Sequence, residues 1–495
     1  MKIKTNHPII VSVFFAIVII ATSRIVFTQI VDVDGWWHIA CGKELVEDRS
    51  LDFSKFYWSE TTEDYSNVNF TWMGDVWLYL VYKYFGDVGL SVLRFILILI
   101  GILCIWLVGN RKANFIKLFA VVLCIVGMYQ GLLVRNSMFA IAFFPAMLYC
   151  LDSRHYILSV FLLVIWSQVH GSYLLGISVI PFFFSYRFNK KSILLACALA
   201  AIFYFNPLTK SYISYSKIKQ IVSEKSPRAL FGTSSESIEF KSPFDVDRAY
   251  VNACIMMISL ILLFVRFKNV RLWLLFCCIT LFGMSYLRLV KYVAMYGLYF
   301  IFKSEKDGNL RHADKMVFLI LAVSACVYSF FWYDKIIYEF NAPGIHKSEF
   351  KFSDKVFEYT KSNYMYEKTF TTMSNGGYGL IKWQPEKKVY IDTYFAPHSQ
   401  KTMDDYKKYI REPVLLKEVC STAIIGLSDM PVVINFIQSR VWFPEAIDQG
   451  MILFNTEKKR LKILIGKSEF DELSEFNKKS FRTALGICTG RIKFR

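Results

Sequence analysis

Long apolar runs separated by short charged connections most constrain how this 495-residue chain can fold. A helix that crosses the roughly 30 Å hydrocarbon core of a bilayer needs about 20 mostly apolar residues. Runs near that length recur along the first two thirds of the chain, and 55% of all residues are hydrophobic and 17% aromatic. Because a soluble protein of this size normally carries more charge, the sequence predicts an α-helical polytopic membrane protein.

Eleven runs are predicted to span the membrane, the first as an uncleaved signal anchor because no small-residue cleavage site precedes "VDVDGWW". They cover residues 9–27, 88–109, 115–131, 137–151, 156–169, 173–186, 192–205, 249–265, 271–286, 289–303 and 315–332. Every second connection is basic, starting with Lys2 and Lys4 before the first run, and basic connections favour the cytoplasmic side. The N-terminus is therefore predicted to be cytoplasmic, in a multi-pass protein of the cytoplasmic (inner) membrane.

The connection after the first run is acidic, and we place it outside. Between residues 31 and 75 ten Asp and Glu residues face only three Lys and Arg residues. Residues 70–85 are rich in Trp and Tyr, and counting them as a span would move the basic connections outside, so we interpret them as an interfacial helix. The sequence thus predicts a transmembrane domain over residues 1–332, with outer loops at 28–87 and 206–248.

The composition changes after Trp332, where charged residues become frequent and apolar runs become short. The β-rich runs "KKVYIDTYF", "STAIIGL" and "MILFN" alternate with the helix-like runs "DKVFEYTKSNY" and "KTMDDYKKYI". This alternation predicts a C-terminal extracytoplasmic α/β soluble domain over residues 333–495. Its two cysteines, Cys420 and Cys488, are able to form a disulfide in an oxidising compartment if they lie close together.

Ionisable residues from distant segments fall at the predicted outer ends of the spans. They are Asp32, Asp34, His38, Arg135, His170, Arg288 and Lys291. Each has a plain alternative: a solvated loop for the aspartates, a packed helix-end histidine, or cations whose stems lie along the apolar surface. Their joint convergence on one side favours function, because ionisable groups at the membrane are costly. The net charge of +18 is explained by the basic inside connections, which disfavours nucleic acid as a partner.

The segment "DVDGWWHIACGKELVED" resembles the first outer loop signature, roughly D-x-D-x-W-W-H, of a bacterial multi-spanning membrane protein group related to GT-C fold glycosyltransferases. The resemblance continues through "TWMGDVWLYLVYKYFGDVGL", "VRNSMFAIAFF", "WSQVHGSYLLG", "FNPLTK" and "IEFKSP" to "SNGGYGLIKWQPEKKVYIDTYFAPH". Ser167 and Gln168 replace Ala-Asn before His170, and Thr393 and Tyr394 replace Gly-Arg after Asp392. The resemblance implies a GT-C-like fold and fixes a class of protein, not a reaction.

It further implies transfer of a sugar from a polyprenyl-phosphate lipid to a glycan, lipid or protein acceptor at the outer membrane face, in surface glycan assembly. Such a reaction needs a general base, for which Asp34 or Asp32 is suited, with Asp34 preferred. The lipid phosphate needs cations, for which Arg135, Arg288 and Lys291 are candidates, and His38 and His170 are candidates for binding donor or acceptor. The Asp-x-Asp pair is able to hold a divalent metal such as Mg²⁺ or Mn²⁺.

Two other functions stay open at the level of the sequence. One is a transporter for a lipid-linked glycan, although the polar residues gather at one face and not at the midplane. The other is a non-catalytic scaffold in envelope polysaccharide assembly, which would tolerate loss of Asp32 and Asp34. No P-loop or dinucleotide-binding pattern is present, so no nucleotide cofactor is predicted.

Overall fold

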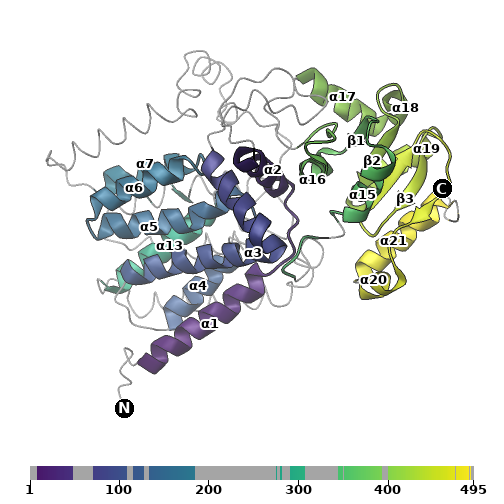
Figure 1. Cartoon of the computed structure of the whole chain (residues 1–495). Helices are drawn as coiled ribbons and strands as arrows, with labels where there is room; N and C mark the ends of the chain where they lie inside the picture. The colour runs from purple at the N-terminus through teal and green to yellow at the C-terminus, as the bar shows by residue number, and fades with distance from the viewer. Residues whose placement is uncertain are drawn as a thin grey trace. The chain divides into compact units, whose positions relative to one another are not determined.

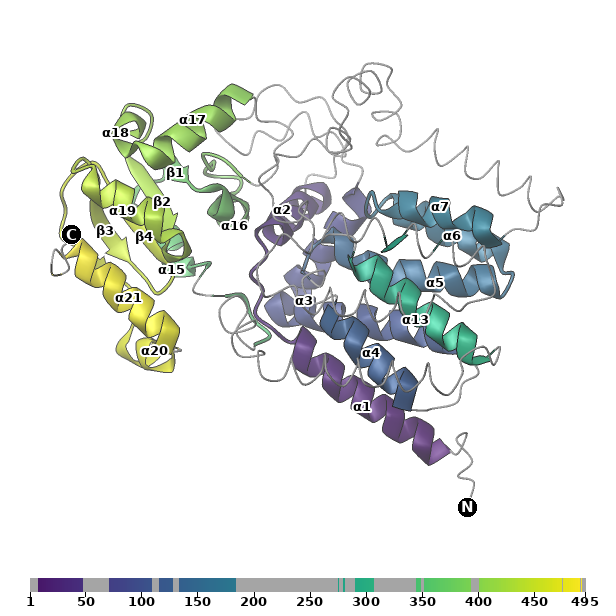
Figure 2. The ribbon, with the colours of Figure 1, turned by 180° about the vertical axis from the view of Figure 1, so that it is seen from behind.

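In a computed structural model the chain forms two compact units, which we describe separately (Figures 1 and 2). The structure describes residues 8–47, 71–108, 115–127, 133–183, 275, 279–280, 290–306, 344–348, 351–392, 400–473, 475–489 and 491. Unit 1 consists of Met1–Ile30 and Phe70–His346, and unit 2 of Val31–Asn69 and Lys347–Arg495. Of the predicted outer loop 28–87, residues 31–69 therefore group with the C-terminal residues, whereas residues 28–30 and 70–87 group with the predicted transmembrane domain.

Unit 1 is a helical bundle whose helices match several predicted spans. Its described helices are α1 (Pro8–Val26), α3 (Trp72–Val108), α4 (Phe115–Gly127), the short 3₁₀ helix η3 (Asn136–Phe139), α5 (Ala140–Asp152), α6 (Tyr156–Ser167), α7 (Tyr173–Phe183) and α13 (Val290–Lys306). The predicted spans at 192–205, 249–265 and 315–332 lie outside the described residues, as does most of 271–286. The count of eleven spans therefore stays a prediction.

Helix α3 contains both the predicted interfacial segment and the following span. Its path breaks at Gly86, which has a φ of 58° and a ψ of −152°, so the helix has two parts that meet at a kink. Positive φ is accessible to glycine because it lacks a Cβ atom. Among the described residues α3 is the one helix long and apolar enough to cross a membrane by length and composition, and no membrane accompanies the structure.

Side-chain contacts show the direction in which neighbouring helices of the bundle run. Phe14 packs on Trp106 at 4.9 Å between ring centroids, while Arg94 donates to the Val26 carbonyl, so α1 is antiparallel to the second part of α3. Helices α5 and α13 end together, since Lys303 at the end of α13 pairs with Asp152 at the end of α5. The alternation expected from the basic connections therefore holds among these helices. The membrane side that each end faces stays a prediction.

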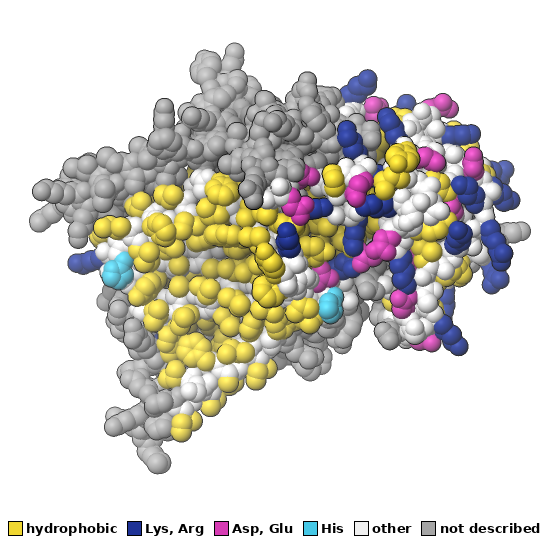
Figure 3. All heavy atoms as spheres, viewed as in Figure 1, with side chains coloured by type: hydrophobic (Ala, Val, Ile, Leu, Met, Phe, Trp, Pro, Cys, Tyr) yellow, Lys and Arg dark blue, Asp and Glu magenta, His cyan; other side chains and the backbone are white. Residues whose placement is uncertain are grey.

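Unit 1 exposes an extensive apolar surface. Large hydrophobic side chains of α1, α3 and α6 are exposed at helical spacing, and they include Ile9, Val13, Ile20, Val92, Ile96, Leu103, Ile157, Phe161 and Val164. Figure 3 shows hydrophobic side chains in a broad area over unit 1, whereas charged side chains gather over unit 2. An apolar surface of this kind marks a membrane interaction surface, because a soluble protein seldom leaves such area in water.

Unit 2 contains a five-stranded sheet with the order β1-β2-β4-β3-β5. The strands are β1 (Thr369–Thr371), β2 (Thr422–Gly426), β3 (Phe443–Ile447), β4 (Met451–Asn455) and β5 (Lys462–Ile463). Strands β1 and β2 are parallel, β4 is antiparallel to both β2 and β3, and β3 and β5 are parallel. The predicted strands in "STAIIGL" and "MILFN" are confirmed. In "KKVYIDTYF" the described residues up to Asp392 hold a single bridge at Val389 and no strand.

Helices cover both faces of this sheet. The helices that follow in sequence are α15 (Asp354–Asn363), α16 (Met373–Trp383), α17 (Gln400–Arg411), α18 (Pro413–Leu416), η8 (Leu427–Asp429), α19 (Met430–Gln438), α20 (Lys467–Glu472) and α21 (Glu475–Cys488). Helix α2 (Val33–Glu47) belongs to the same unit and packs on α16. Ala423 and Ile425 of β2 face the main core, which includes Phe436 and Phe481 from α19 and α21. Helices α15 and α16 contact β4 and β2 (Figure 1). The helices predicted from "DKVFEYTKSNY" and "KTMDDYKKYI" are confirmed as α15 and α17.

Candidate functional site

Unit 1 brings together several predicted site residues at one end of its bundle. The start of α3 meets the α6–α7 turn, where Trp72 Nε1 donates to Gln168 Oε1 at 3.0 Å. The start of α13 meets η3, where Lys291 Nζ donates to the Ser137 carbonyl at 3.1 Å. Arg135 immediately precedes η3. These contacts link segments that lie far apart in the sequence, and we call this region the polar end of unit 1.

Both described cations at the polar end are nearly inaccessible to water. Arg135 is 6% exposed and Lys291 is 3% exposed. Lys291 lies over the ring of Tyr292, with 5.6 Å between Nζ and the ring centroid. A buried cation is costly unless it has partners, and such groups in membrane proteins tend to mark substrate or ion sites. Arg288 lies outside the described residues, as does the loop 206–248.

The same end buries a carboxylate that the sequence analysis did not single out. Asp75 in the first turn of α3 is 0% exposed and accepts hydrogen bonds from Thr71 Oγ1 and Asn136 Nδ2. A Cβ on Gly74 would lie 2.8 Å from the Asn136 side chain, so only glycine permits this close approach. The signal was present in the sequence as "GD" before an apolar run and "RN" before another, but their pairing depends on the tertiary fold.

His170 lies in the turn between α6 and α7 and is half-buried. Its Nδ1 atom accepts a hydrogen bond from the Ser172 backbone N–H at 3.1 Å and lies 2.7 Å from Ser172 Oγ. Trp166 Nε1 donates to the same hydroxyl at 3.2 Å. These bonds fix the imidazole ring locally, so His170 is held at the polar end by its own turn.

The predicted catalytic aspartates belong to unit 2, at the start of α2. Asp32 is 7% exposed, and its Oδ1 accepts from the Asp34 backbone N–H at 3.3 Å, as a residue at a helix N-cap does. Asp34 lies in the first turn of α2 and is half-buried, and His38 follows one turn later. A negative charge in the first turn is favoured by the helix dipole.

Trp36 and Trp37 lie in α2, directly after the first turn that holds Asp34. Trp36 is 0% exposed, and its ring lies 5.5 Å from Phe352 and 5.0 Å from Tyr378 between centroids. Trp37 is 6% exposed. The Trp36 ring therefore belongs to the packing of unit 2, where it meets Phe352 and Tyr378 of α16. Cys41 of the same helix is 0% exposed.

The glycines of "SNGGYG" in α16 explain how this helix approaches α2 and the segment ending at Asp392. A Cβ on Gly377 would lie 2.9 Å from the Val33 carbonyl oxygen and 3.1 Å from the Trp37 backbone nitrogen. A Cβ on Gly376 would lie 2.0 Å from the Ile391 carbonyl oxygen. A side chain at either position would therefore push α16 away from α2 or from the segment ending at Asp392. The motifs are remote in sequence and form one packed unit.

Two charged residues of unit 2 lie near the first turn of α2. Lys351 Nζ donates to the Val31 carbonyl at 3.4 Å. Burial lowers the pKa of Lys351, while the carboxylates of Asp32 and Asp429 act in the opposite direction. Burial also raises the pKa of Asp429, opposed by a hydrogen bond from Ser374 and by the charge of Lys351. The sequence analysis missed both residues, because nothing local connects positions 351 and 429 to position 32.

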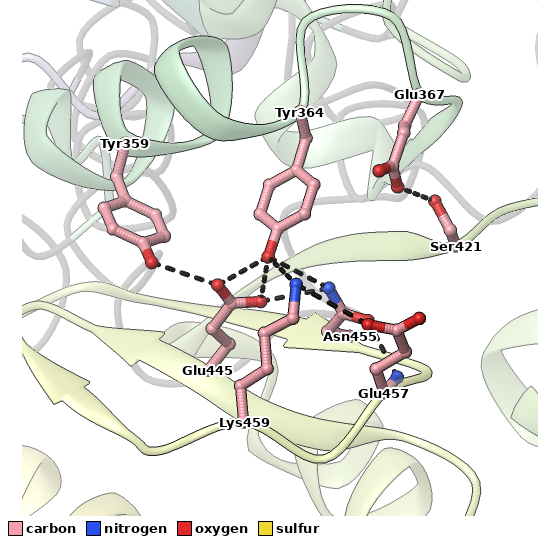
Figure 4. A network of polar contacts seen from close by, with 8 residues as sticks. All are labelled: Tyr359, Tyr364, Glu367, Ser421, Glu445, Asn455, Glu457 and Lys459. Atoms are coloured by element: carbon pink, nitrogen blue, oxygen red, sulfur yellow. Dashed lines mark hydrogen bonds and ion pairs between the residues drawn. The ribbon is translucent and has the colours of Figure 1, made fainter.

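A second polar network of unit 2 surrounds Glu445, which is 3% exposed (Figure 4). Glu445 accepts hydrogen bonds from Tyr359, Tyr364 and Asn455, and Lys459 donates to the Tyr364 hydroxyl at 2.7 Å. These residues join α15 to β3, β4 and the segment after β4. Because the donors to this buried carboxylate come from different helices and strands, the network is suited to stabilising unit 2.

Neither the metal nor the disulfide considered from the sequence has support in the described residues. Among these residues, no three His, Cys, Asp or Glu side chains form a group that could hold a metal ion. Asp32 instead uses one carboxylate oxygen to accept from the α2 backbone. Cys420 and Cys488 are both free thiols.

No protein-family model matches the chain, and no curated protein sequence matches it. Its structure is similar to that of the apo oligosaccharyltransferase of Archaeoglobus fulgidus, with a TM-score of 0.50 and 10% identity, over 91% of this chain and 75% of that chain. The complex of AglB from the same organism with an inhibitory peptide and a dolichol-phosphate gives a TM-score of 0.50 and 10% identity, over 86% and 71% of the two chains.

The arabinofuranosyltransferase AftD from Mycobacteria is similar at a TM-score of 0.51 and 10% identity, over 91% of this chain and 41% of AftD. These proteins are GT-C fold glycosyltransferases of membranes. The likeness therefore shows that the chain has the GT-C fold, mostly helical with a small sheet, which confirms the predicted fold at this level.

Proposed function

We propose that the protein is a membrane glycosyltransferase that transfers a sugar from a polyprenyl-phosphate-linked donor to an acceptor in surface glycan assembly. One observation carries the proposal: two buried cations, Arg135 and Lys291, gather at one end of a helical bundle whose fold is that of GT-C glycosyltransferases. One similar structure, that of AglB, contains a dolichol-phosphate, which supports a lipid phosphate as the donor class.

In the proposed reaction an acceptor hydroxyl oxygen attacks the anomeric carbon of the sugar. The bond between that carbon and the phosphate oxygen breaks, and the electron pair leaves with the lipid phosphate. Asp34 takes the hydroxyl proton as general base, which requires that its carboxylate be ionised. Arg135, Lys291 and Arg288 stabilise the negative charge that develops on the leaving phosphate, and His170 and His38 bind donor or acceptor. Asp32 orients Asp34 through the hydrogen bond at the start of α2.

The test replaces the chromosomal gene with variants and compares the surface glycan of each strain by mass and sugar composition. We expect the deletion strain and the Asp34→Asn strain to lack the same glycan, and the wild-type gene to restore it. Asn keeps the size of the side chain while removing its basicity. If a strain with Asn at both positions 32 and 34 makes its normal glycan with normal amounts of protein in the membrane, the transferase proposal fails and a scaffold role replaces it.

A further inference from the structure

The first turn of α2 is held within unit 2 by groups from a segment more than 300 residues away. The Gly377 backbone lies against Val33 and Trp37, and the ring of Trp36 packs between Phe352 and Tyr378. These contacts fix the helix by shape. They do not by themselves fix the charged residues at its start, which need polar partners.

Lys351 supplies such a partner. Its ammonium donates to the Val31 carbonyl, the last residue before Asp32, and it interacts with the carboxylates of Asp32 and Asp429. Asp429 is held from the other side, since Ser374 Oγ donates to its Oδ2 at 3.1 Å. Ser374 lies in the first turn of α16, the helix whose glycines contact α2. The charged groups therefore lie where α16 packs against α2, as the glycines do.

Lys351 is half-buried, and a lysine in such a position stabilises a fold only weakly, because desolvation of the ammonium offsets part of its attraction to carboxylates. Neighbouring aromatic packing already secures α2 without it. The contribution of Lys351 is therefore expected to be local orientation and not global stability.

We propose that Lys351 is a positioning residue: its ammonium, bonded to the Val31 carbonyl, fixes the first turn of α2 and thereby the direction of Asp34. The role in holding α2 depends only on the contacts within unit 2. Its consequence for sugar transfer rests on the function proposed above.

The experiment measures amide hydrogen exchange across the full-length protein in detergent, for wild type, Lys351→Met, Lys351→Arg and Lys355→Met. Met keeps the length of the stem and removes the charge, whereas Arg keeps the charge. Lys355 is the matched control, because it is an exposed lysine of the same unit that pairs with Glu469 and donates to the Leu464 carbonyl. Labelling of the buried thiol of Cys41 with a maleimide reports on the same helix independently.

We expect Lys351→Met to speed exchange in the first turns of α2 about tenfold or more, as for loss of a hydrogen bond to a charged group. Cys41 should react faster in the same variant. Lys351→Arg should restore protection, and Lys355→Met should leave α2 unchanged. Unchanged protection of α2 in Lys351→Met would overturn the proposal, as would equal loss of protection in strands β2 and β4.

The surface glycan measured in the same strains separates this inference from the proposed function. A loosened α2 together with a lowered glycan level in Lys351→Met supports both. A loosened α2 in a protein whose deletion leaves the glycan unchanged supports the positioning role and overturns the transferase. Full glycan production by Lys351→Met despite a loosened α2 would overturn the link between Lys351 and Asp34.

Discussion

Both units bury a carboxylate at the start of a helix, and the partners described above differ between the two. In unit 1, Asp75 accepts from the uncharged donors Thr71 and Asn136 at the start of α3. In unit 2, the charge of the Lys351 ammonium acts on the buried carboxylate of Asp32 and on the half-buried carboxylate of Asp429. Uncharged donors at a helix N-terminus stabilise a carboxylate within the fold. A cation from a distant segment also orients the carboxylate, and this effect is lost when the cation is replaced by an uncharged residue.

Under the proposed function, Asp75 has a structural role and Asp34 has a chemical one. Asp75 joins α3 to η3 and so assembles the polar end of unit 1, where Arg135 and Lys291 lie. Asp34 is half-buried, and the first turn of α2 that carries it is held by neighbouring residues. Partial exposure is expected of a carboxylate that must exchange a proton with substrate. Loss of charge should therefore affect transfer at Asp34, and stability at Asp75.

The largest effect is expected for Asp34→Asn. Loss of a general base should lower transfer by roughly 10²–10⁴-fold, while folding and membrane insertion stay normal. The measurement is the rate of sugar transfer by purified protein in liposomes, once the glycan of the deletion strain has identified the acceptor. Asp32→Asn should cost less, because Asp32 acts through α2. A larger loss for Asp32→Asn than for Asp34→Asn would exchange the two roles.

The second effect concerns the cations of the polar end. Lys291→Met should weaken binding of a polyprenyl phosphate about 10- to 100-fold, the loss expected for a hydrogen bond to a charged group. Native mass spectrometry of the protein with polyprenyl phosphate measures this directly. The matched control is Lys303→Met at the other end of the same helix, which loses its pair with Asp152 instead. Equal weakening in both variants would contradict a phosphate site at the polar end.

The third effect should appear in stability. Asp75→Ala leaves the buried Asn136 and Thr71 donors without this acceptor, which costs about 1–3 kcal/mol. Thermal unfolding in detergent should show a lower midpoint, while transfer per folded molecule stays within about threefold of wild type. A loss of transfer like that of Asp34→Asn, with no change in midpoint, would instead make Asp75 part of the chemistry.

The sequence predicted what depends on local pattern. Apolar runs located α1, α4, α5, α6 and α7 to within a few residues, because a bilayer sets helix length and composition. Basic connections gave the alternation that brings Gln168, Lys291 and the start of α3 to one end. Residues that a common topology places together can be found this way even when they are distant in sequence.

Pairings across long sequence distances could not be predicted. The burial of Trp36 in α2 depends on Phe352 and Tyr378, which lie more than 300 residues further along the chain. Lys351 and Asp429 carry no motif, and their relation to Asp32 is a product of the packing of α16. The strand expected near Tyr390 is not formed in the described residues, because the neighbouring Ile391 backbone packs against Gly376 of α16.

The smallest effect is expected at a third buried carboxylate, Glu445 of β3 in unit 2. Its hydrogen-bond donors are uncharged, as are those described for Asp75. Tyr364→Phe removes one donor and should cost about 0.5–1.5 kcal/mol at neutral pH. Tyr366, fully exposed in the same turn, supplies the control Tyr366→Phe, which should cost almost nothing.

The loss should also depend on pH in a direction that identifies its cause. Burial, with the hydrogen bond to Glu445, raises the pKa of Tyr364 to about 12 in the folded protein, against about 10 for an unfolded tyrosine. The folded state thus holds this proton more tightly, so the contribution is complete below about pH 10 and is lost as the pH rises towards 12. Unfolding midpoints of wild type and Tyr364→Phe, followed by circular dichroism, should converge as the pH rises from 9 to 11.5. A constant difference over this range would show that Tyr364 acts through ring packing and not through its bond to the carboxylate.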